Sequence, residues 1–454
     1  MGISRGSTAP AGNFLLASGT RHVSNSHAPL GEKRDTPPSA SKSKGKVNQS
    51  FTRVQTAARL AASFHSRTGK NLPGGTVMGC MRWAGYGSNK DAAEIVVSEG
   101  RASFTGVFRC KGQWACDCCS RRHTESARSW LRGCLFPALE AKGLTGSMAT
   151  FTIPHRRSDN WGEVVSALKI AWQKTDRRLG KLWKRIGSVG KFKALEVKVG
   201  KNGIHPHLHV FISHQFGADT DEIQRQIGQV WVSACLELGR EVSAHGFDWQ
   251  SNCLSDYVAK GDCSLDLSGT NSSELQQHGL TLGQLLDKAN LGDREAAEDW
   301  IRAIAALQGT HRFHSGGLAK KLGLDPRAEW EDPFVLAKIE ASKHQKKVLI
   351  SYPRLSHQKA TLHNHGRPAL ALILRSARSG REAPVLEMVA ALCRATDRAL
   401  ERKALLASTT KSELADVMTN AGLGPLKTMR ERELYLLIKR RPTHLRRSGM
   451  ALRL

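Results

Sequence analysis

The chain lacks long apolar segments, internal repeats and any excess of acidic residues, and it holds only four tyrosines among 454 residues. No apolar stretch reaches 18 residues, which excludes a membrane-spanning helix and predicts no membrane partner. The missing repeats exclude a solenoid. Residues 13–18 form too short an apolar core for a signal peptide, so we expect a cytoplasmic protein.

Acidic residues are scarce relative to basic ones. Lys and Arg number 68 against 40 Asp and Glu, a net charge of +28, and such an excess favours binding to phosphate backbones. Residues 1–70 hold eleven basic and two acidic side chains, and residues 331–454 hold twenty-four and eleven. We expect residues 1–70 to be a disordered basic tail and residues 331–454 to be a basic region with helices that could contact DNA.

Three histidines alternate along one predicted strand. In residues 203–212, GIHPHLHVFI, a side-chain period of two places His205, His207 and His209 on one face. The other face carries the apolar residues Ile204, Leu208, Val210 and Ile212. This pattern predicts a strand that is anchored in a core and presents imidazoles as metal ligands.

A second strand, within residues 192–200, precedes the first, and Asn202-Gly203 between the two runs predicts a hairpin. A turn at Lys201-Asn202 places Glu196 opposite His207, whereas a turn at Asn202-Gly203 places it opposite His209. Either register brings one carboxylate beside two imidazoles, a ligand set for Mn2+ or Mg2+ that Zn2+ or Ni2+ would also accept. His205 is either a third ligand or a residue that supports a ligand or faces DNA.

Cysteines form a second predicted metal site. Cys116 and Cys119 make a C-x-x-C knuckle, and Cys80 and Cys110 complete a tetrahedral structural zinc site in a module of residues 75–125. Cys118 or His123 could replace one of these ligands. A disulfide framework is the alternative, and a chain without a signal peptide disfavours it.

Several of these residues occur in an order that resembles a known family. TFTIPH at 150–155, then Glu196, NGIHPHLH at 202–209 and YVAK at 257–260 resemble the ordered motifs of plasmid rolling-circle replication initiators, single-tyrosine HUH endonucleases of the actinobacterial plasmid type. The resemblance runs from about residue 80 to about residue 324. It implies that a metal held by His207 and His209 polarises a scissile phosphate of origin DNA.

The resemblance also implies that a tyrosine attacks this phosphate, leaving a 5′-phosphotyrosine and a free 3′-OH primer. We predict Tyr257 as the nucleophile, on a helix of residues 252–262 where Lys260 lies on the same side and favours the phenolate. Single-stranded and duplex origin DNA, a host helicase and a polymerase are the implied partners, and a homo-oligomer is left open. Some such initiators carry a glutamate one helical turn before the tyrosine, and Cys253 occupies that position here, so the terminating nucleophile stays unassigned.

The predicted fold class is α+β. Residues 126–265 read as a βαββαβ nickase unit, a ferredoxin-like palm whose antiparallel sheet has helices on one face, followed by a helical extension at 266–330. Thr150 and Thr152 on the first strand would lie beside the hairpin, where hydroxyls contact DNA phosphate or support a ligand. Trp161, Trp172 and Trp183 have the spacing of core residues on one long helix.

Two other functions fit the same residues. One is an HUH relaxase or single-strand transposase, which shares the chemistry. The other is a zinc-containing DNA-binding regulator whose HUH fold has lost activity.

Overall fold

The structure is a computed structural model that describes residues 40–72, 75–82, 92–98, 101–243, 246–251, 253, 279–324, 347–361 and 367–408. The helices of the N-terminal half are α1 (Ala40–Thr68), the 3₁₀ turn η1 (Gly75–Met78), α2 (Asp117–Trp130), the π-helical turn η2 (Leu131–Leu135), α3 (Phe136–Glu140), α4 (Trp161–Arg178), α5 (Gly180–Arg185) and α6 (Thr220–Leu236). Those that follow are α9 (Leu282–Asn290), α10 (Arg294–Ala306), α11 (Leu318–Leu322), α13 (Arg354–Thr361), α14 (Pro368–Ala377) and α15 (Ala383–Ser408). The strands are β1 (Ala92–Ser98), β2 (Arg101–Thr105), β3 (Leu144–Phe151), β4 (Lys191–Gly200), β5 (Gly203–Gln215), β6 (Phe247–Gln250), β7 (Leu280–Thr281), β8 (Phe313–His314) and β9 (Lys347–Pro353).

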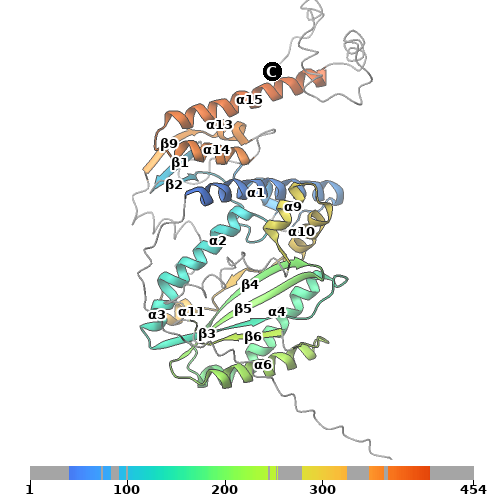
Figure 1. The fold of residues 1–454 in the computed structure, drawn as a ribbon, viewed down its shortest axis with the longest axis vertical. Coiled ribbons are helices and arrows are strands. Elements are labelled where there is room, and N and C mark those ends of the chain that lie inside the picture. The colour runs from blue at the N-terminus through green and yellow to red at the C-terminus, as the bar shows by residue number, and fades with distance from the viewer. Residues whose placement is uncertain are drawn as a thin grey trace, which may run out of the picture.

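The larger sheet is antiparallel and lies in the lower half of the molecule (Figure 1). Its strands are ordered β6-β3-β5-β4-β7, and β8 also pairs with β4. The chain passes through β3, α4, β4, β5, α6 and β6 in that order, so each of the two long helices connects two strands. The one long helix predicted to carry Trp161, Trp172 and Trp183 is interrupted at Leu179, where α4 ends and α5 begins.

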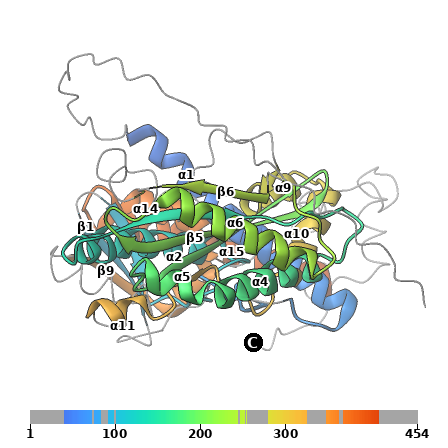
Figure 2. The same cartoon turned by 90° about the horizontal axis from the view of Figure 1, so that it is seen from below.

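One face of this sheet is covered by α4, α5 and α6, which lie in front of it in Figure 2. Phe151 of β3 points into this layer, and its ring centroid lies 5.0 Å from that of Trp172 and 4.8 Å from that of Trp231. Trp161, Trp172 and Trp183 are all buried. The prediction that these tryptophans belong to the core is confirmed.

The opposite face is half covered, which differs from the predicted sheet with helices on one face only. At one end, Met148, Phe192 and Phe211 pack beneath apolar side chains of α2, η2 and α3, among them Trp130 and Phe136. Helices α2 and α3 and the turn η2 pack on this end because its side chains are aromatic, whereas the side chains at the histidine-bearing end are polar. The histidine-bearing end of this face lies outside this apolar cluster.

A second, three-stranded antiparallel sheet has the order β2-β1-β9. Strands β1 and β2 pair in the antiparallel sense, with Glu94 opposite Thr105. Strand β9 comes from residues 347–353, so the cysteine-bearing module is built from both halves of the chain and is not confined to residues 75–125. Helices α13, α14 and α15 lie beside this sheet in the upper half of Figure 1.

Helix α1 corrects the prediction of a disordered tail over residues 1–70. Its residues Phe51, Val54, Ala57 and Ala61 are buried in the main core, and the helix crosses the middle of the molecule between the two sheets (Figure 1). Its apolar residues recur at helical spacing. Residues 1–39 and the predicted DNA-binding helices near residues 412–440 lie outside the described part of the chain. Within the described part, no helix is both long enough and apolar enough to cross a membrane.

Candidate functional site

The histidine strand β5 alternates as predicted. His205, His207 and His209 are half-buried, whereas Ile204, Leu208 and their apolar neighbours are buried. The strand continues through Pro206, which pairs with Val197 of β4. Pairing with β3 ends at Leu208, so a residue without a backbone N–H is tolerated at position 206.

The hairpin adopts the first of the two predicted registers. Gly200 pairs with Gly203, which leaves Lys201 and Asn202 as the turn and places Glu196 opposite His207. Gly203 has φ +86°, a conformation that glycine adopts without strain. A Cβ atom there would lie 2.9 Å from Nε1 of Trp161, so the tip of the hairpin has no room for a side chain.

His209 is held from both sides. Its Nε2 lies 3.2 Å from Oε2 of Glu196, and its Nδ1 lies 3.1 Å from Oγ1 of Thr150 on β3. An ionised carboxylate only accepts, so Nε2–H donates to Glu196 and the Thr150 hydroxyl donates to Nδ1. With a cation on Nε2, the proton would move to Nδ1 and the same hydroxyl would accept it. Thr150 can therefore hold His209 in either tautomer. Its hydroxyl is already hydrogen-bonded to His209, a candidate metal ligand.

The electrostatics favour a neutral imidazole beside a charged carboxylate. Burial favours the neutral acid at Glu196, but the hydrogen bond from His209 and the nearby positive charges outweigh it and hold its pKa at about 2. Burial, together with the neighbouring His205 and His209, lowers the pKa of His207 to about 3. Neutral imidazole and ionised carboxylate are the forms that bind metal ions.

A fourth histidine extends the row. The ring of His155 lies 4.8 Å from that of His205, which lies 4.2 Å from that of His207, and His207 and His209 are nearly parallel with centroids 6.2 Å apart. The Nδ1 of His155 donates to the carbonyl of Ile153, which leaves Nε2 free to accept. His205 therefore faces His155 and lies away from Glu196.

The predicted catalytic metal stays a prediction. The 3.2 Å between His209 and Glu196 suits two neighbouring ligands of an octahedral cation, which stand about 3 Å apart. Among the described residues, however, only the cysteines form a group of three or more whose ligand atoms all lie within 4.8 Å of one another. His207 would have to rotate toward Glu196 to complete the set.

The predicted nucleophile cannot be placed, because Tyr257 and Lys260 lie outside the described residues. Of the four tyrosines, only Tyr352 is described, and it is buried with its hydroxyl 2.8 Å from Nδ1 of His357. Cys253 is buried in the apolar cluster and donates to the carbonyl of Gln250. Thr152 follows the end of β3, where its amide donates to the carbonyl of Gly246.

The four predicted cysteines come together. Sγ of Cys80 lies 3.6 Å from that of Cys119 and 3.5 Å from that of Cys116, and Sγ of Cys110 lies 3.7 Å from that of Cys119. Four thiolates around zinc at about 2.3 Å stand about 3.8 Å apart, so this cluster fits a structural metal such as zinc. All four cysteines are free of disulfides.

The two alternative ligands are engaged elsewhere. Sγ of Cys118 lies 3.6 Å from the hydroxyl of Ser50, and Nε2 of His123 donates to the carbonyl of Lys111. Neither residue belongs to the cluster.

Backbone geometry at the cysteines supports metal binding. Met81 and Lys111, at φ 61° and 54°, are the described non-glycine residues with positive φ, and each directly follows a cysteine of the cluster. Such conformations are costly and mark places where the surrounding structure enforces a turn. Amide groups of Cys110 and Gly112 point at sulfur atoms, at 3.5 Å each. Cys116 and Cys119 lie at the start of α2, where the helix dipole favours thiolate.

The cysteine loop is tied directly to the histidine-bearing sheet. The amide of Arg312 donates to Gln113 at 2.6 Å, and Nε1 of Trp114 donates to the carbonyl of Thr310 at 3.2 Å. The carbonyl of Arg312 in turn accepts from the amide of Leu195 on β4, next to Glu196. The cysteine cluster and the histidine site are therefore connected through a few covalent and hydrogen bonds, which run from Gln113 through Arg312 to Leu195.

Three residues of the site were missed in the sequence. Lys198 is buried with its ammonium 3.6 Å from Oε1 of Glu196, and Asp248 of β6 pairs with Thr150. Lys198 lies two positions after Glu196 on β4, so the alternation of side chains along the strand would have placed it on the same face. His155 ends the TFTIPH motif but lies beyond β3, so strand alternation does not assign it to the site. Asp248 was placed by the pairing of β6 with β3.

Comparisons with known proteins identify no relative, so the function has to be inferred from the geometry of the site. No protein-family model, curated protein or solved structure matches the chain.

Proposed function

We propose that the protein is a metal-dependent endonuclease of the HUH type that nicks one DNA strand at a plasmid origin, in rolling-circle replication. The observation that carries the proposal is the placement of His209 between Thr150 and Glu196, with His207 opposite Glu196 on the same face. A carboxylate and two neutral imidazoles on a rigid hairpin are a ligand set for a cation that polarises phosphate.

The proposed fold is the ferredoxin-like palm. Its support is the order β6-β3-β5-β4 together with the connection through α4 and α6, which is a βαββαβ arrangement. The open end of the histidine face supplies a platform for a single strand, next to the cation site.

In the proposed reaction, the phenol oxygen of Tyr257 forms a bond to phosphorus while the bond from phosphorus to the 3′-oxygen breaks. The phenol proton leaves to solvent or a base, and the released 3′-oxygen takes up a proton to become a hydroxyl. One phosphodiester replaces another, so the strand can later be resealed without an external energy source. The bound cation would stabilise the charge on the pentacoordinate phosphate.

The decisive experiment uses the full chain with Mn2+ and a labelled single-stranded oligonucleotide pool from the element that encodes it. A covalent protein–DNA adduct should form, map to Tyr257 by mass spectrometry, and disappear in Tyr257→Phe. Tyr86→Phe is the matched control and should retain the adduct. An adduct that persists in Tyr257→Phe, or none under any metal and salt condition, contradicts the proposal.

We expect DNA cleavage and DNA retention to depend on different residues. His207→Ala with His209→Ala should abolish the adduct and leave DNA retention nearly unchanged, because the basic chain ends supply most of the net charge. A retention loss as large as the cleavage loss contradicts this division. A wild-type protein that retains DNA without cleaving it would instead be the zinc-containing regulator.

A further inference from the structure

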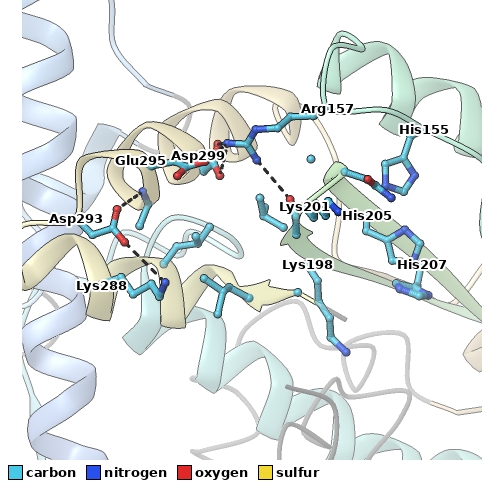
Figure 3. A pocket seen from close by; sticks show the side chains of 18 residues that line it. His155, Arg157, Lys198, Lys201, His205, His207, Lys288, Asp293, Glu295 and Asp299 are labelled. Atoms are coloured by element: carbon cyan, nitrogen blue, oxygen red, sulfur yellow. Dashed lines mark hydrogen bonds and ion pairs between the residues drawn. The ribbon is translucent and has the colours of Figure 1, made fainter. Parts of the chain in front are cut away.

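A pocket of about 660 Å³ opens beside the histidine row, between the tip of the β4–β5 hairpin and the helices α9 and α10 (Figure 3). Pockets that bind small organic ligands have volumes of about 300–1,000 Å³. His207 lies on its rim and also faces Glu196, so the pocket adjoins the candidate cation site.

The two walls of the pocket differ in charge. The hairpin wall carries Lys198, Lys201 and the imidazoles of His155, His205 and His207. The helix wall carries Asp293, Glu295 and Asp299, together with the apolar side chain of Leu285, and Leu280 of β7 also lines the pocket.

The carboxylates of the helix wall are paired with basic side chains. Arg157 lies 2.7 Å from Glu295 and 3.0 Å from Asp299, and Lys288 lies 3.8 Å from Asp293 (Figure 3). On the hairpin wall, the ammonium of Lys201 attracts an anion, whereas Lys198 already lies 3.6 Å from Glu196. A second anion deeper in the pocket would meet carboxylates, so only a ligand with one anionic end and one neutral end fits both walls.

We propose that this pocket holds one unstacked nucleotide of the DNA strand, its phosphate against the hairpin wall and its base toward Leu280 and Leu285. This inference rests on the proposed function and names which part of the strand the site recognises. A base out of the stack buries its faces against apolar side chains and its edge against the acceptors of the helix wall. The nucleotide next to the scissile phosphate would thereby be fixed beside the cation.

The test measures binding in EDTA, so that cleavage plays no part. The probes are a ten-residue oligothymidylate and an abasic deoxyribose-phosphate chain of equal length and charge, each followed by fluorescence anisotropy. The full-length protein should bind the oligothymidylate about tenfold more tightly than the abasic chain.

A pocket-blocking variant gives the proposal its discriminating outcome. Asn202→Trp places a large ring at the turn, where Asn202 is exposed and lines the pocket, and should lower the affinity ratio to about one. Lys181→Glu, on the exposed side of α5 away from the pocket, is the control and should keep the tenfold ratio. Circular dichroism and thermal unfolding verify that both variants fold.

An affinity ratio of one in the wild type, or a ratio that survives in Asn202→Trp, overturns the pocket proposal even if the protein cleaves DNA. A ratio that behaves as expected in a protein that forms no adduct supports the pocket and contradicts the nickase. The two proposals can thus fail separately.

Discussion

Single side chains decide whether the histidine face can hold a cation. The period of two along residues 203–212 was sufficient to predict which residues share that face, because a strand allows no other assignment. It could not predict that the Thr150 hydroxyl would meet Nδ1 of His209, since this contact depends on how β3 pairs with β5.

Removing that hydroxyl should weaken the cation site. Thr150→Val keeps the side-chain shape but cannot hold the tautomer of His209, and we expect Mn2+ affinity to fall about 10- to 100-fold. Isothermal titration would measure this, with Thr152→Val as the control. Equal effects of the two variants would show that the hydroxyl of Thr150 does not support a ligand.

A buried histidine should make the protein sensitive to acid. Burial lowers the pKa of His357 to about 4, against about 6.5 in the unfolded chain. The unfolded state therefore takes up the proton first, and stability that is complete above pH 6.5 falls as the pH drops toward 4, by up to about 3 kcal/mol for this group.

Urea unfolding at several pH values tests this linkage. His357→Gln should be less stable than the wild type at pH 7, because it loses the bonds to Tyr352 and Met81, yet lose less stability between pH 6.5 and 4.5. An unchanged pH slope in the variant would rule out His357 as a source of the acid sensitivity.

At the scale of elements, the β4–β5 hairpin was predicted almost completely. Asn202-Gly203 indicated the turn, and the two alternating runs left only two registers open. The structure selected the one with Lys201-Asn202 as the turn, because Gly203 takes the positive φ. Helix α1 was missed, since composition suggested disorder while its apolar residues recur at helical spacing.

The hairpin tip should be sensitive to an added methyl group. Gly203→Ala combines a positive φ with a contact of 2.9 Å to Trp161, and we expect a loss of about 3 kcal/mol in the free energy of unfolding. Gly217→Ala, at φ +82° with nothing within 4 Å, carries only the backbone cost of about 1 kcal/mol. Equal losses in chemical denaturation would mean that the tip has room for the methyl group.

Helix α1 joins the cysteine module to the helices beside the pocket. Arg53 lies 3.3 Å from Asp117 at the start of α2 and 2.6 Å from Asp287 of α9. Arg53→Met leaves two partly buried carboxylates without this partner, and we expect a loss of about 2 kcal/mol in the free energy of unfolding.

Thermal unfolding would measure the loss, and Arg67→Met, at the exposed end of the same helix, should cost little. A loss in Arg53→Met no larger than that in the control would show that the ion pairs do not hold α1 in place.

At the scale of the whole molecule, the ligands of the cysteine cluster could be predicted from the sequence, but the sheet beside it could not. The knuckle spacing predicted Cys116 and Cys119, and Cys80 and Cys110 were chosen to complete a tetrahedral set, with Cys118 and His123 as alternatives that the structure excludes from the cluster. The pairing of β1 with β9 was not predictable, because a contact between residues more than 250 positions apart leaves no local pattern.

Metal binding by this cluster should stabilise the fold. Cys116→Ser should lower the zinc content to near zero and the unfolding midpoint by on the order of 10 °C, because the metal would hold the segments that carry Cys80 and Cys110 against the start of α2. Cys118→Ser, two positions along and outside the cluster, should retain the metal. An unfolding midpoint that a chelator leaves unchanged would count against a structural zinc.

The three-stranded sheet also orders events during synthesis. Strand β1 leaves the ribosome early, but its neighbour β9 spans Lys347–Pro353 and emerges some 250 residues later. The histidine-bearing sheet, complete by residue 314, can assemble first. A nascent chain halted before β9 would thus carry a formed histidine-bearing sheet beside an unfinished three-stranded sheet.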